Sequence, residues 1–417
     1  MSTFAEFDHY DLPLGPDGTP YEFYEALRDE AVKTEKYVQW SEAYGGFWVI
    51  AGWNESRAIQ LNNTTFSNVS VTFPAYATPG GKPFMLSGMD EPEHKHYRAM
   101  VQGPFTSESA ERMDAQIRAI CNALIDTIIE SGRADVCDVT TYLPEQATAA
   151  VLGLPLSDAP KYRSFVEAIV QGATDPEGAA PKIVEMEKYW ADTVAEKRLN
   201  PTPGLLSEII NSEYNGERLN GGELLDFFTV LILGGLDNTA RFLGNVFYRL
   251  AWDKELRRRL AKHPELVPLA VEEFLRLDGP ACVFRLVEED IEVGGVQMTK
   301  GQIVGLISTI SNRDPRQFTN PDTFVLDRSP NRHTALGSGI HRCLGLNLVR
   351  VEVRAMIQEF LRRVPEFDLD LERPTVWVSG QVSAMHHVPI VFPAGKKEVG
   401  IELSADQKAD ERLVGVA

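Results

Sequence analysis

The chain has 417 residues with 41 Lys or Arg against 60 Asp or Glu, which gives a formal net charge of −19, and 43% of its residues are hydrophobic. A chain of this length can bury enough apolar surface to fold without disulfides or a structural metal, so a small stapled scaffold is excluded. The acidic excess argues against nucleic acid as a partner, because binding to phosphates needs concentrated Lys and Arg.

The sequence predicts no targeting or membrane segment. The first ten residues lack the basic and apolar regions of a secretory signal. The longest apolar run, Phe227–Leu236, has about half of the ~20 residues that a membrane span needs. No Cys-x-x-Cys pair occurs among Cys121, Cys137, Cys282 and Cys343, which argues against a disulfide framework or a zinc site. We therefore expect a soluble, cytoplasmic protein that binds no membrane.

A polar loop rich in Pro and Gly is expected over the first twenty residues, and most of the chain after it carries apolar residues at helical spacing. The expected helices cover residues 21–32, 107–131, 156–171, 177–198, 221–252, 254–262, 264–278 and 344–363. The expected strands are short and cover residues 47–51, 291–296 and 303–308, with a hairpin within 376–392. Two irregular stretches, 72–90 and 172–180, are expected to be mobile covers of a site.

These elements predict a mostly α-helical protein with small β-sheets, which is the α+β class. No internal repeat or low-complexity linker interrupts the chain, so we expect one large domain over residues 1–395. The polar C-terminal tail, residues 396–417, is expected to be flexible.

The segment Leu336–Gly345 is the most informative stretch, because its three glycines allow the backbone to approach a ligand closely. Cys343 falls at the start of the next predicted helix, where the helix dipole and free N–H groups stabilise a thiolate. No base or second cysteine is nearby, which favours a single axial metal ligand, and haem iron accepts one protein thiolate. The alternative is a cysteine packed as a small apolar residue, which we expect for Cys121, Cys137 and Cys282.

This segment resembles the haem-binding signature of the cytochrome P450 family, Phe-x-x-Gly-x-His-x-Cys-x-Gly. Gly339, His341, Cys343 and Gly345 match the signature, whereas Leu336 replaces its phenylalanine. The resemblance implies the cytochrome P450 fold, with haem b between a long central helix and the cysteine loop and with its iron bound by Cys343. It also implies a monooxygenase that uses dioxygen.

The same resemblance implies roles for charged residues elsewhere. Cations are expected to bind the two haem propionates, and the matching positions are His94, Arg98, Arg285 and His341. A structural network is expected to join Glu273, Arg276 and Arg328. In isolation, each of these residues would more often be an ordinary surface charge.

The long helix expected over residues 221–252 contains the unusual sequence Gly234-Gly235-Leu-Asp237-Asn238. Glycine within a helix costs about 1 kcal/mol relative to alanine, so the pair indicates either tight helix packing or function. By resemblance this is the oxygen-binding helix, with Asn238 at the position where the family usually has threonine. We expect Asp237 to relay protons toward dioxygen and Asn238 to bond the substrate's oxygen or a pocket water.

Within the family, the resemblance extends to bacterial members that hydroxylate cineole, through residues 12–20, 40–46, 237–243, 330–333 and 387–390. It implies a small monoterpenoid substrate such as cineole. The implied pocket residues are mostly apolar, which suits a compact hydrocarbon with one oxygen; they are Thr72, Phe73, Tyr76, Leu233, Asn238, Ala281 and Val382.

Three alternatives stay open at this point. Another monoterpenoid or an aromatic ether that undergoes O-dealkylation could be the substrate, because one methylene changes binding by only about 1–3 kcal/mol. A haem-binding sensor that never activates oxygen is a remote alternative, which Asn238 allows and Asp237 argues against. A peroxide-driven enzyme is less favoured, because the Asp237-Asn238 pair lacks the arginine that would anchor an acidic substrate.

Electrons must come from a separate ferredoxin or flavodoxin, because the chain contains no flavin or iron–sulfur motif. Basic residues around the cysteine loop and its helix are expected to form the docking surface for this acidic partner. They are Arg332, Arg342, Arg350 and Arg354, with Lys95 and His96.

Overall fold

The computed structural model describes residues 4–74, 84–172, 175–202, 204–214 and 216–398. Its chain forms two compact units, each assembled from separate stretches of sequence. Unit 1 consists of Met1–Ala75, Arg241–Leu346 and Asp368–Pro389, and unit 2 consists of Tyr76–Ala240, Asn347–Phe367 and Ile390–Ala417. The single domain over residues 1–395 stays a prediction, and residues 399–417 of the predicted tail lie outside the described residues.

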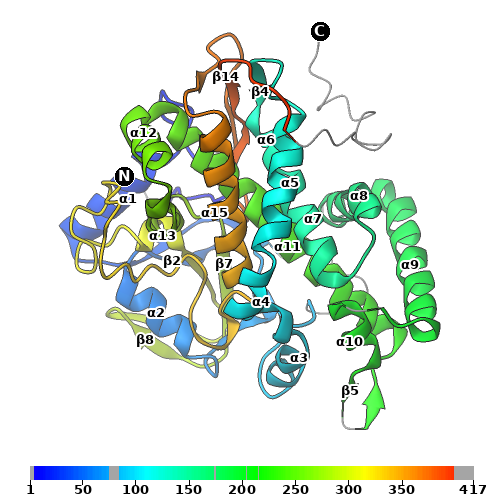
Figure 1. Ribbon diagram of the computed structural model, residues 1–417. Helices are drawn as coiled ribbons and strands as arrows, with labels where there is room; N and C mark the ends of the chain where they lie inside the picture. The colour runs from blue at the N-terminus through cyan, green and yellow to red at the C-terminus, as the bar shows by residue number, and fades with distance from the viewer. Residues whose placement is uncertain (1–3, 75–83, 173–174, 203, 215, 399–417) are drawn as a thin grey trace. The chain divides into compact units, whose positions relative to one another are not determined.

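Unit 1 contains most of the strands and the helices that cover them (Figure 1). Its helices and short 3-10 helices are α1 (Tyr21–Thr34), η1 (Ala43–Gly45), α2 (Trp53–Leu61), η2 (Asn68–Ser70), α12 (Lys254–Lys262), η6 (Pro264–Leu266), α13 (Val267–Asp278), α14 (Ser308–Ser311) and η7 (Gly339–His341). Its strands are β1 (Val38–Ser41), β2 (Phe47–Ile50), β3 (Phe66–Ser67), β7 (Cys282–Val287), β8 (Ile291–Val293), β9 (Val296–Met298), β10 (Ile303–Ile307), β11 (Asp368–Leu369), β12 (Val376–Val378) and β13 (Ala384–His387).

Unit 2 is mainly helical. Its helices are α3 (Glu93–Val101), η4 (Gly103–Phe105), α4 (Ser107–Arg112), α5 (Asp114–Asp126), α6 (Val136–Thr140), α7 (Tyr142–Leu152), η5 (Leu156–Asp158), α8 (Ala159–Gln171), α9 (Pro176–Leu199) and α10 (Leu205–Asn211). Its short strands are β4 (Arg133–Asp135), β5 (Glu213–Tyr214) and β6 (Glu217–Arg218). Among the described residues, three elements cross the division of the chain: α11 (Gly221–Trp252), α15 (Leu346–Arg363) and β14 (Pro389–Val391). The prediction of a mostly helical protein with small sheets is confirmed.

The largest sheet of unit 1 has, in the described residues, five strands in the order β1-β2-β10-β7-β3. Neighbouring strands are antiparallel except β10 and β2, which run parallel with Val304 opposite Trp48. Apolar side chains form two buried clusters from this sheet, one that includes Phe47 and Phe284 and one that includes Val38 and Met298. The sheet and its two buried clusters therefore fix the position of β7 and of the strands beside it.

The N-terminal segment contributes to this core although its composition predicts only a polar loop. Phe4 and Phe7 are fully buried in the cluster that contains Phe47. Ser41 Oγ donates to the Phe7 carbonyl at 2.7 Å, and the amide of Glu42 donates to the Ala5 carbonyl at 3.1 Å. Two apolar side chains in a polar stretch give no periodic pattern, so the sequence could not reveal that the segment is anchored.

In unit 2, α5 and α15 lie side by side, as Figure 1 shows, and charged groups join them. Arg118 Nη1 donates to Glu359 Oε1 at 2.8 Å, and Arg354 bonds both Glu111 and Asp114. On another side of this unit α8 and α9 pack against one another, with the Tyr162 ring stacked on Trp190. The second half of the helix that follows the cysteine loop is thus held by α4 and α5.

Several predicted boundaries change for local reasons. Residues 107–131 form two helices, α4 and α5, instead of one. The strand expected over residues 291–296 is a hairpin, because Gly294 and Gly295 have φ values of 58° and 77° and form a tight turn between β8 and β9. Helix α7 escaped prediction because it is buried on almost every side, which removes the polar stripe that marks an amphipathic helix. In contrast, α11 and α12 have the expected bounds.

Among the described residues, no helix is long and apolar enough to cross a membrane.

Glu352 is a buried carboxyl group on α15, and burial raises its pKa to about 8 from a usual value of 4.5. The folded protein therefore binds more protons than the unfolded chain between these two pH values, so this group makes stability fall as the pH rises through that window. We expect Glu352→Gln to remove this loss and to stabilise the fold by about 3 kcal/mol at pH 7. Urea unfolding at pH 5 and pH 8 measures the effect.

The matched control is Glu359→Gln on the same helix. Burial raises the pKa of Glu359, but its bonds to Arg118, Asn122 and Arg362 outweigh burial, and the net shift is downward. That substitution should destabilise the protein at neutral pH, the opposite sign to Glu352→Gln. An equal pH dependence of the free energy of unfolding in the wild type and in Glu352→Gln would contradict the burial argument.

Candidate active site

The cysteine loop of unit 1 is closed by backbone hydrogen bonds. The Cys343 amide donates to the Leu336 carbonyl at 2.8 Å, and the Gly337 amide donates to the Thr334 carbonyl at 2.8 Å. Because Leu336 closes the loop through a backbone atom, the absence of the signature's phenylalanine leaves this bond in place. Helix α15 begins at Leu346, so Cys343 precedes the helix by three residues rather than opening it as predicted.

Gly339 has the backbone and the surroundings of an obligatory glycine. Its φ is +72°, a conformation that residues with a Cβ rarely adopt. A Cβ at this position would lie 2.5 Å from the carbonyl oxygen of Gln60 on α2. The cysteine loop therefore rests directly on the end of α2, and a side chain at residue 339 would push the two apart.

Cys343 differs from the other three cysteines in its accessibility. Cys121, Cys137 and Cys282 are buried, whereas Cys343 is partly exposed. Burial raises the pKa of Cys282 to about 12 and that of Cys121 well above its usual range, so these two thiols stay protonated. Of the four, Cys343 is the thiol that a ligand can reach.

The predicted propionate-binding residues are divided between the two units. Arg285 on β7 and His341 in η7 belong to unit 1, and Arg285 is only 6% exposed, with Nη1 donating to the Phe284 carbonyl at 2.7 Å. His94 and Arg98 lie one turn apart on α3 of unit 2. Burial, and then the charge of Arg98, lowers the pKa of His94, which favours a neutral ring that can still donate to a carboxylate.

The two adjacent glycines of α11 have different surroundings. A Cβ at Gly235 would lie 2.6 Å from Oγ1 of Thr148 on α7, so this glycine allows tight helix packing. Outside its own stretch of helix, a Cβ at Gly234 would meet no heavy atom of the described residues within 4 Å. Gly234 is exposed, although Leu231, Ile232 and Leu236 around it are buried. Packing thus explains Gly235, whereas Gly234 opens one face of the helix.

Asn238 lies four residues after Gly234, so both are on the same face of α11. Its side-chain oxygen Oδ1 is buried and has no hydrogen-bond partner among the described residues. A buried acceptor without a donor is costly, and it indicates a site where water or a ligand completes the bonding. Asp237 precedes it and, like Asn238 and Leu233, is half-buried.

The predicted pocket-wall residues of unit 1 come together from three distant stretches. Ala281 and Val382 are paired by a β-bridge. The carbonyl of Val71, next to Thr72, accepts from the Phe284 amide at 3.1 Å and from Gln381 Nε2 at 3.2 Å.

The Phe73 ring packs against Phe47 and Phe284 with centroids 5.7 Å apart in both cases, so this partly buried ring lies against the core of unit 1. Tyr76 lies outside the described residues, whereas Leu233 and Asn238 belong to unit 2.

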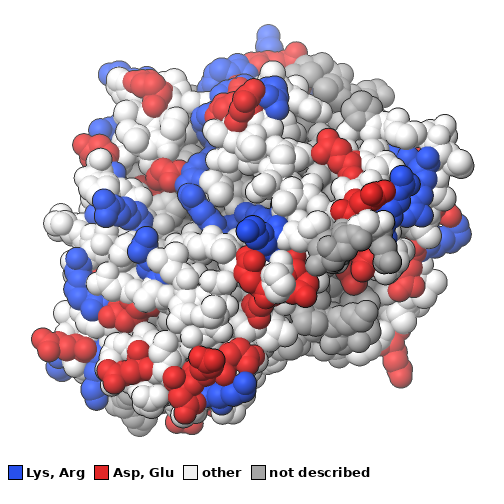
Figure 2. Space-filling model, turned by 90° about the horizontal axis from the view of Figure 1, so that it is seen from below, with Lys and Arg blue, Asp and Glu red and all other residues white. Residues whose placement is uncertain are grey.

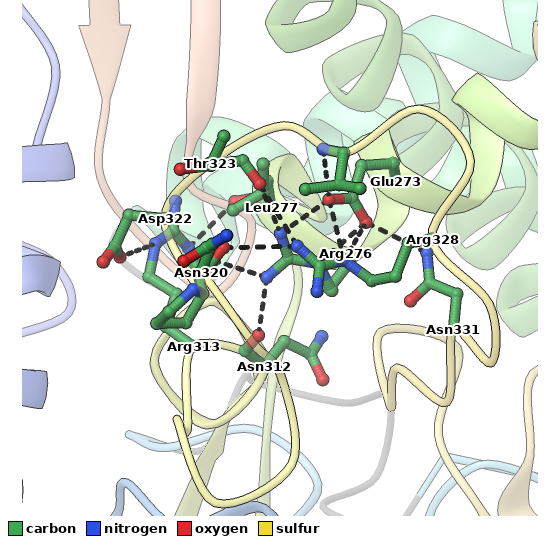
Figure 3. A network of polar contacts seen from close by, with 12 residues as sticks. Glu273, Arg276, Leu277, Asn312, Arg313, Asn320, Asp322, Thr323, Arg328 and Asn331 are labelled. Carbon is green, nitrogen blue, oxygen red and sulfur yellow. Dashed lines mark hydrogen bonds and ion pairs between the residues drawn. The ribbon is translucent and has the colours of Figure 1, made fainter.

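Glu273, Arg276 and Arg328 form the buried network expected from the sequence, as Figure 3 shows. Glu273 Oε1 lies 2.7 Å from Arg276 Nη2 and 3.0 Å from Arg328 Nε. Burial raises the pKa of the Glu273 carboxyl, but the two guanidinium groups and the Val325 amide outweigh burial, and the net shift is downward. Asn331 also donates to Glu273 Oε2 at 3.0 Å, a member that the sequence motif did not indicate.

This network extends through backbone carbonyls to fix the loop before the cysteine segment. Arg276 Nη1 donates to the carbonyl of Asn312 (Figure 3) and to that of Pro321. Arg328 Nη1 donates to the carbonyl of Thr319. Its charges are therefore paired inside unit 1, and the structural role of the three residues stays a prediction.

The expected docking residues differ in their exposure. Arg332 and Arg342 are exposed in unit 1, whereas Arg350 is half-buried. Arg354 forms ion pairs with Glu111 at 2.8 Å and Asp114 at 2.7 Å, which leaves little net charge at that position. Figure 2 shows Lys and Arg interspersed with Asp and Glu on the face it displays, although the chain as a whole is strongly acidic.

Each unit contains groups of the kinds that bind a haem. An accessible thiol in a glycine-rich loop can ligate iron, buried arginine and histidine side chains can bind carboxylates, and Gly234 opens a helix face beside a polar amide. Within the described part of the chain, no group of three or more His, Cys, Asp or Glu side chains could hold a metal ion. A single thiolate on haem iron needs no such group.

Comparison with known proteins decides the family. The family described as cytochrome P450 matches residues 166–376. The mycinamicin IV hydroxylase/epoxidase of Micromonospora griseorubida is 30% identical over 368 residues, which cover 85% of this chain and 91% of that protein. The chain is a cytochrome P450. A cytochrome P450 of Bacillus subtilis is 28% identical over 390 residues, with 89% of this chain and 94% of that protein covered.

The crystal structure of CYP101J2 superposes on this P450 with a TM-score of 0.83 and 25% identity, covering 94% of this chain and 98% of that one. The predictions of a P450 fold, of a monooxygenase and of haem with cysteine-ligated iron are confirmed at the level of the family. Enzymes of this family use dioxygen and electrons from redox partners. None of these three proteins is described by its name as a cineole hydroxylase, so this part of the resemblance stays a proposal.

Proposed function

We propose that this P450 hydroxylates a small monoterpenoid and that its substrate is cineole. The observation that carries the proposal is the amide of Asn238 on the open face of α11, with its oxygen buried and without a donor in the described residues. An amide can donate through Nδ2 to an ether oxygen while water donates to Oδ1. Ala281 and Val382 supply apolar wall surface, which suits the hydrocarbon part of such a substrate.

Each functional residue has a defined task in this proposal. Cys343 ligates the haem, whose chemistry supplies the activation of dioxygen and the insertion of one oxygen atom. His94, Arg98, Arg285 and His341 bind its propionates. Asp237 passes protons along the helix face, and Asn238 orients the substrate through its oxygen. We also propose Thr72, Phe73, Tyr76 and Leu233 as further pocket residues, although Phe73 is partly buried against the core.

Electrons are proposed to come from a separate acidic ferredoxin or flavodoxin. The exposed residues Arg332 and Arg342 flank the cysteine loop and support a docking surface there. Arg354 contributes little, because Glu111 and Asp114 neutralise it. The cytoplasm is the proposed location, since a reduced partner protein is supplied there and unpaired thiols such as Cys121 stay reduced.

O-dealkylation of an aromatic ether and hydroxylation of another monoterpenoid are the competing reactions. The name of the Micromonospora relative describes both a hydroxylase and an epoxidase, so epoxidation of an unsaturated substrate is a further competitor. The product distinguishes them: a ring alcohol from hydroxylation, an aldehyde released from an alkoxy carbon by dealkylation, and an oxirane from epoxidation.

The first experiment is a titration of the ferric holoprotein with cineole, followed by the haem absorption band. We expect a saturable change of the haem band from low to high spin if a terpenoid binds beside the haem that Cys343 would hold. A haem band that does not respond to cineole, but responds to other monoterpenoids or to aromatic ethers, overturns the substrate. Turnover with a ferredoxin system then identifies the product.

Asn238→Ala should change both the position of oxidation and the coupling of electrons to product. Loss of one oriented hydrogen bond is worth about 1 kcal/mol, so the affinity for an oxygenated substrate should fall about fivefold. Product analysis and the ratio of product formed to electrons consumed measure the two effects.

The control is Asn238→Thr, which restores the family's usual residue and keeps a donor at the same position. If Asn238→Ala leaves both regiochemistry and coupling at wild-type values, Asn238 does not orient the substrate.

A further inference from the structure

The backbone of Val71–Phe73 is held at both of its ends by long-range hydrogen bonds. At one end, the Val71 carbonyl accepts from the Phe284 amide on β7 and from Gln381 Nε2. At the other end, the Phe73 carbonyl lies 2.7 Å from His9 Nε2. Thr72 is the residue between these two fixed carbonyls, so its orientation depends on both.

His9 reaches this position from the N-terminal segment. It is 2% exposed, and its ring lies among aromatic rings, with centroid distances of 4.9 Å to Phe284 and 5.9 Å to Phe47. Phe4 and Phe7 anchor the same segment in the core of unit 1. Because a phenylalanine would pack in such surroundings as well as a histidine does, packing alone does not explain a polar ring at this position.

The protonation of His9 fixes the direction of its hydrogen bond. Burial lowers the pKa of His9 to about 4, in spite of the Phe73 carbonyl and Asp8, so the ring is neutral at physiological pH. A neutral imidazole has one N–H, and a carbonyl can only accept, so Nε2 carries the proton. Nδ1 is buried and has no partner among the described residues. The ring therefore makes one hydrogen bond, which Nε2 donates to the Phe73 carbonyl.

We propose that His9 is a positioning residue for substrate binding, which sets the backbone of Thr72 and Phe73 against the wall formed by Ala281 and Val382. Gln381 connects the two parts, because it precedes Val382 in the chain and bonds the Val71 carbonyl. The inference rests on the proposed function in so far as Thr72 faces the substrate. His9 itself touches neither haem nor substrate in this proposal.

Two amide substitutions distinguish the effect of the hydrogen bond from the effect of side-chain polarity. His9→Gln places an amide nitrogen at about the reach of Nε2, so it can still donate to Phe73. His9→Asn carries the same amide on a shorter side chain that cannot reach this carbonyl. Tyr44→Phe is the control, because the Tyr44 ring packs against both His9 and Phe73 while its hydroxyl bonds only Asp8 in the described contacts.

The first readout is hydrogen exchange of the Phe284 amide, which needs no substrate. This amide donates to the Val71 carbonyl, whereas the Val287 amide on the same strand donates to Gln302 at 2.9 Å and serves as an internal reference. We expect exchange at Phe284 to be at least about fivefold faster in His9→Asn, with Val287 unchanged. His9→Gln and Tyr44→Phe should stay within about twofold of wild type.

The second readout is binding to the ferric holoprotein, measured by the haem band with cineole and with 4-phenylimidazole. We expect the dissociation constant of cineole to rise about fivefold in His9→Asn and to stay near the wild-type value in His9→Gln. A wild-type protein that binds 4-phenylimidazole but not cineole would overturn the proposed substrate. The affinities of the variants for 4-phenylimidazole and the exchange rate of the Phe284 amide would still test His9.

Equal exchange at Phe284 and equal ligand affinities in the Asn and Gln variants would overturn the role of His9. A uniform loss of stability, with exchange faster at Phe284 and Val287 alike, would also overturn it, because it would show that His9 only supports the fold. Retained haem content in the Gln variant establishes that the segment still folds when the ring is replaced.

Discussion

Replacement of Cys343 by alanine is expected to abolish monooxygenase turnover, with a loss of more than about a hundredfold. Loss of a residue that merely orients a metal ligand already lowers metal affinity or activity about ten- to a hundredfold, and Cys343 is the ligand itself. It is also the partly exposed cysteine of the four, in a loop that backbone bonds close. Haem content, the absorption of the reduced carbon monoxide complex and product formation measure the loss.

The matched control is Cys121→Ala, which removes the same thiol from the core of unit 2. Cys121 is fully buried, and burial raises its pKa well above the usual range, so it has no part in iron binding. That variant should lose some stability and keep the thiolate type of haem spectrum. A Cys343→Ala protein that retains this spectrum would show that another group holds the iron.

Replacement of Glu273 by alanine is expected to have the largest effect on folding. Glu273 and Arg276 are completely buried, so loss of the carboxylate leaves two guanidinium groups without their charge partner inside unit 1. Breaking a buried ion pair in this way costs about 3–5 kcal/mol. Urea unfolding and the yield of folded haem protein measure the effect.

Glu108→Ala is the control, because Glu108 pairs with Arg112 at 2.8 Å on the exposed surface of α4. An exposed pair one helical turn apart contributes about 0.3–0.5 kcal/mol, so its loss should be near the limit of detection. Similar unfolding curves for the two variants would contradict a structural role for Glu273.

The pH dependence of the Glu273 network has a definite sign. The net shift of the Glu273 pKa in the folded protein is downward, so the unfolded chain binds more protons as the pH falls. The stabilisation is therefore present above the unfolded pKa and is lost as the pH drops through the folded pKa. Glu352 has the opposite pH dependence, because its contribution to stability is lost as the pH rises.

Local patterns in the sequence determined a large part of the fold and the chemical centre. Helices α11 and α12 have the expected bounds, because their apolar periodicity is contained within each segment. The cysteine signature likewise carries its glycines and its ligand in one short stretch. The spacing of Glu273 and Arg276 on one helix face was readable, although their burial was not.

Contacts between distant residues decided the rest, because a sequence pattern reports only neighbours along the chain. Thr148 gives Gly235 a packing role and leaves Gly234 open, which the Gly-Gly pair alone could not show. Glu111 and Asp114 neutralise Arg354, although the sequence suggested a free positive charge. The bond from His9 to Phe73 joins residues 64 positions apart. Such pairings depend on how separate elements pack, so only the tertiary structure could assign them.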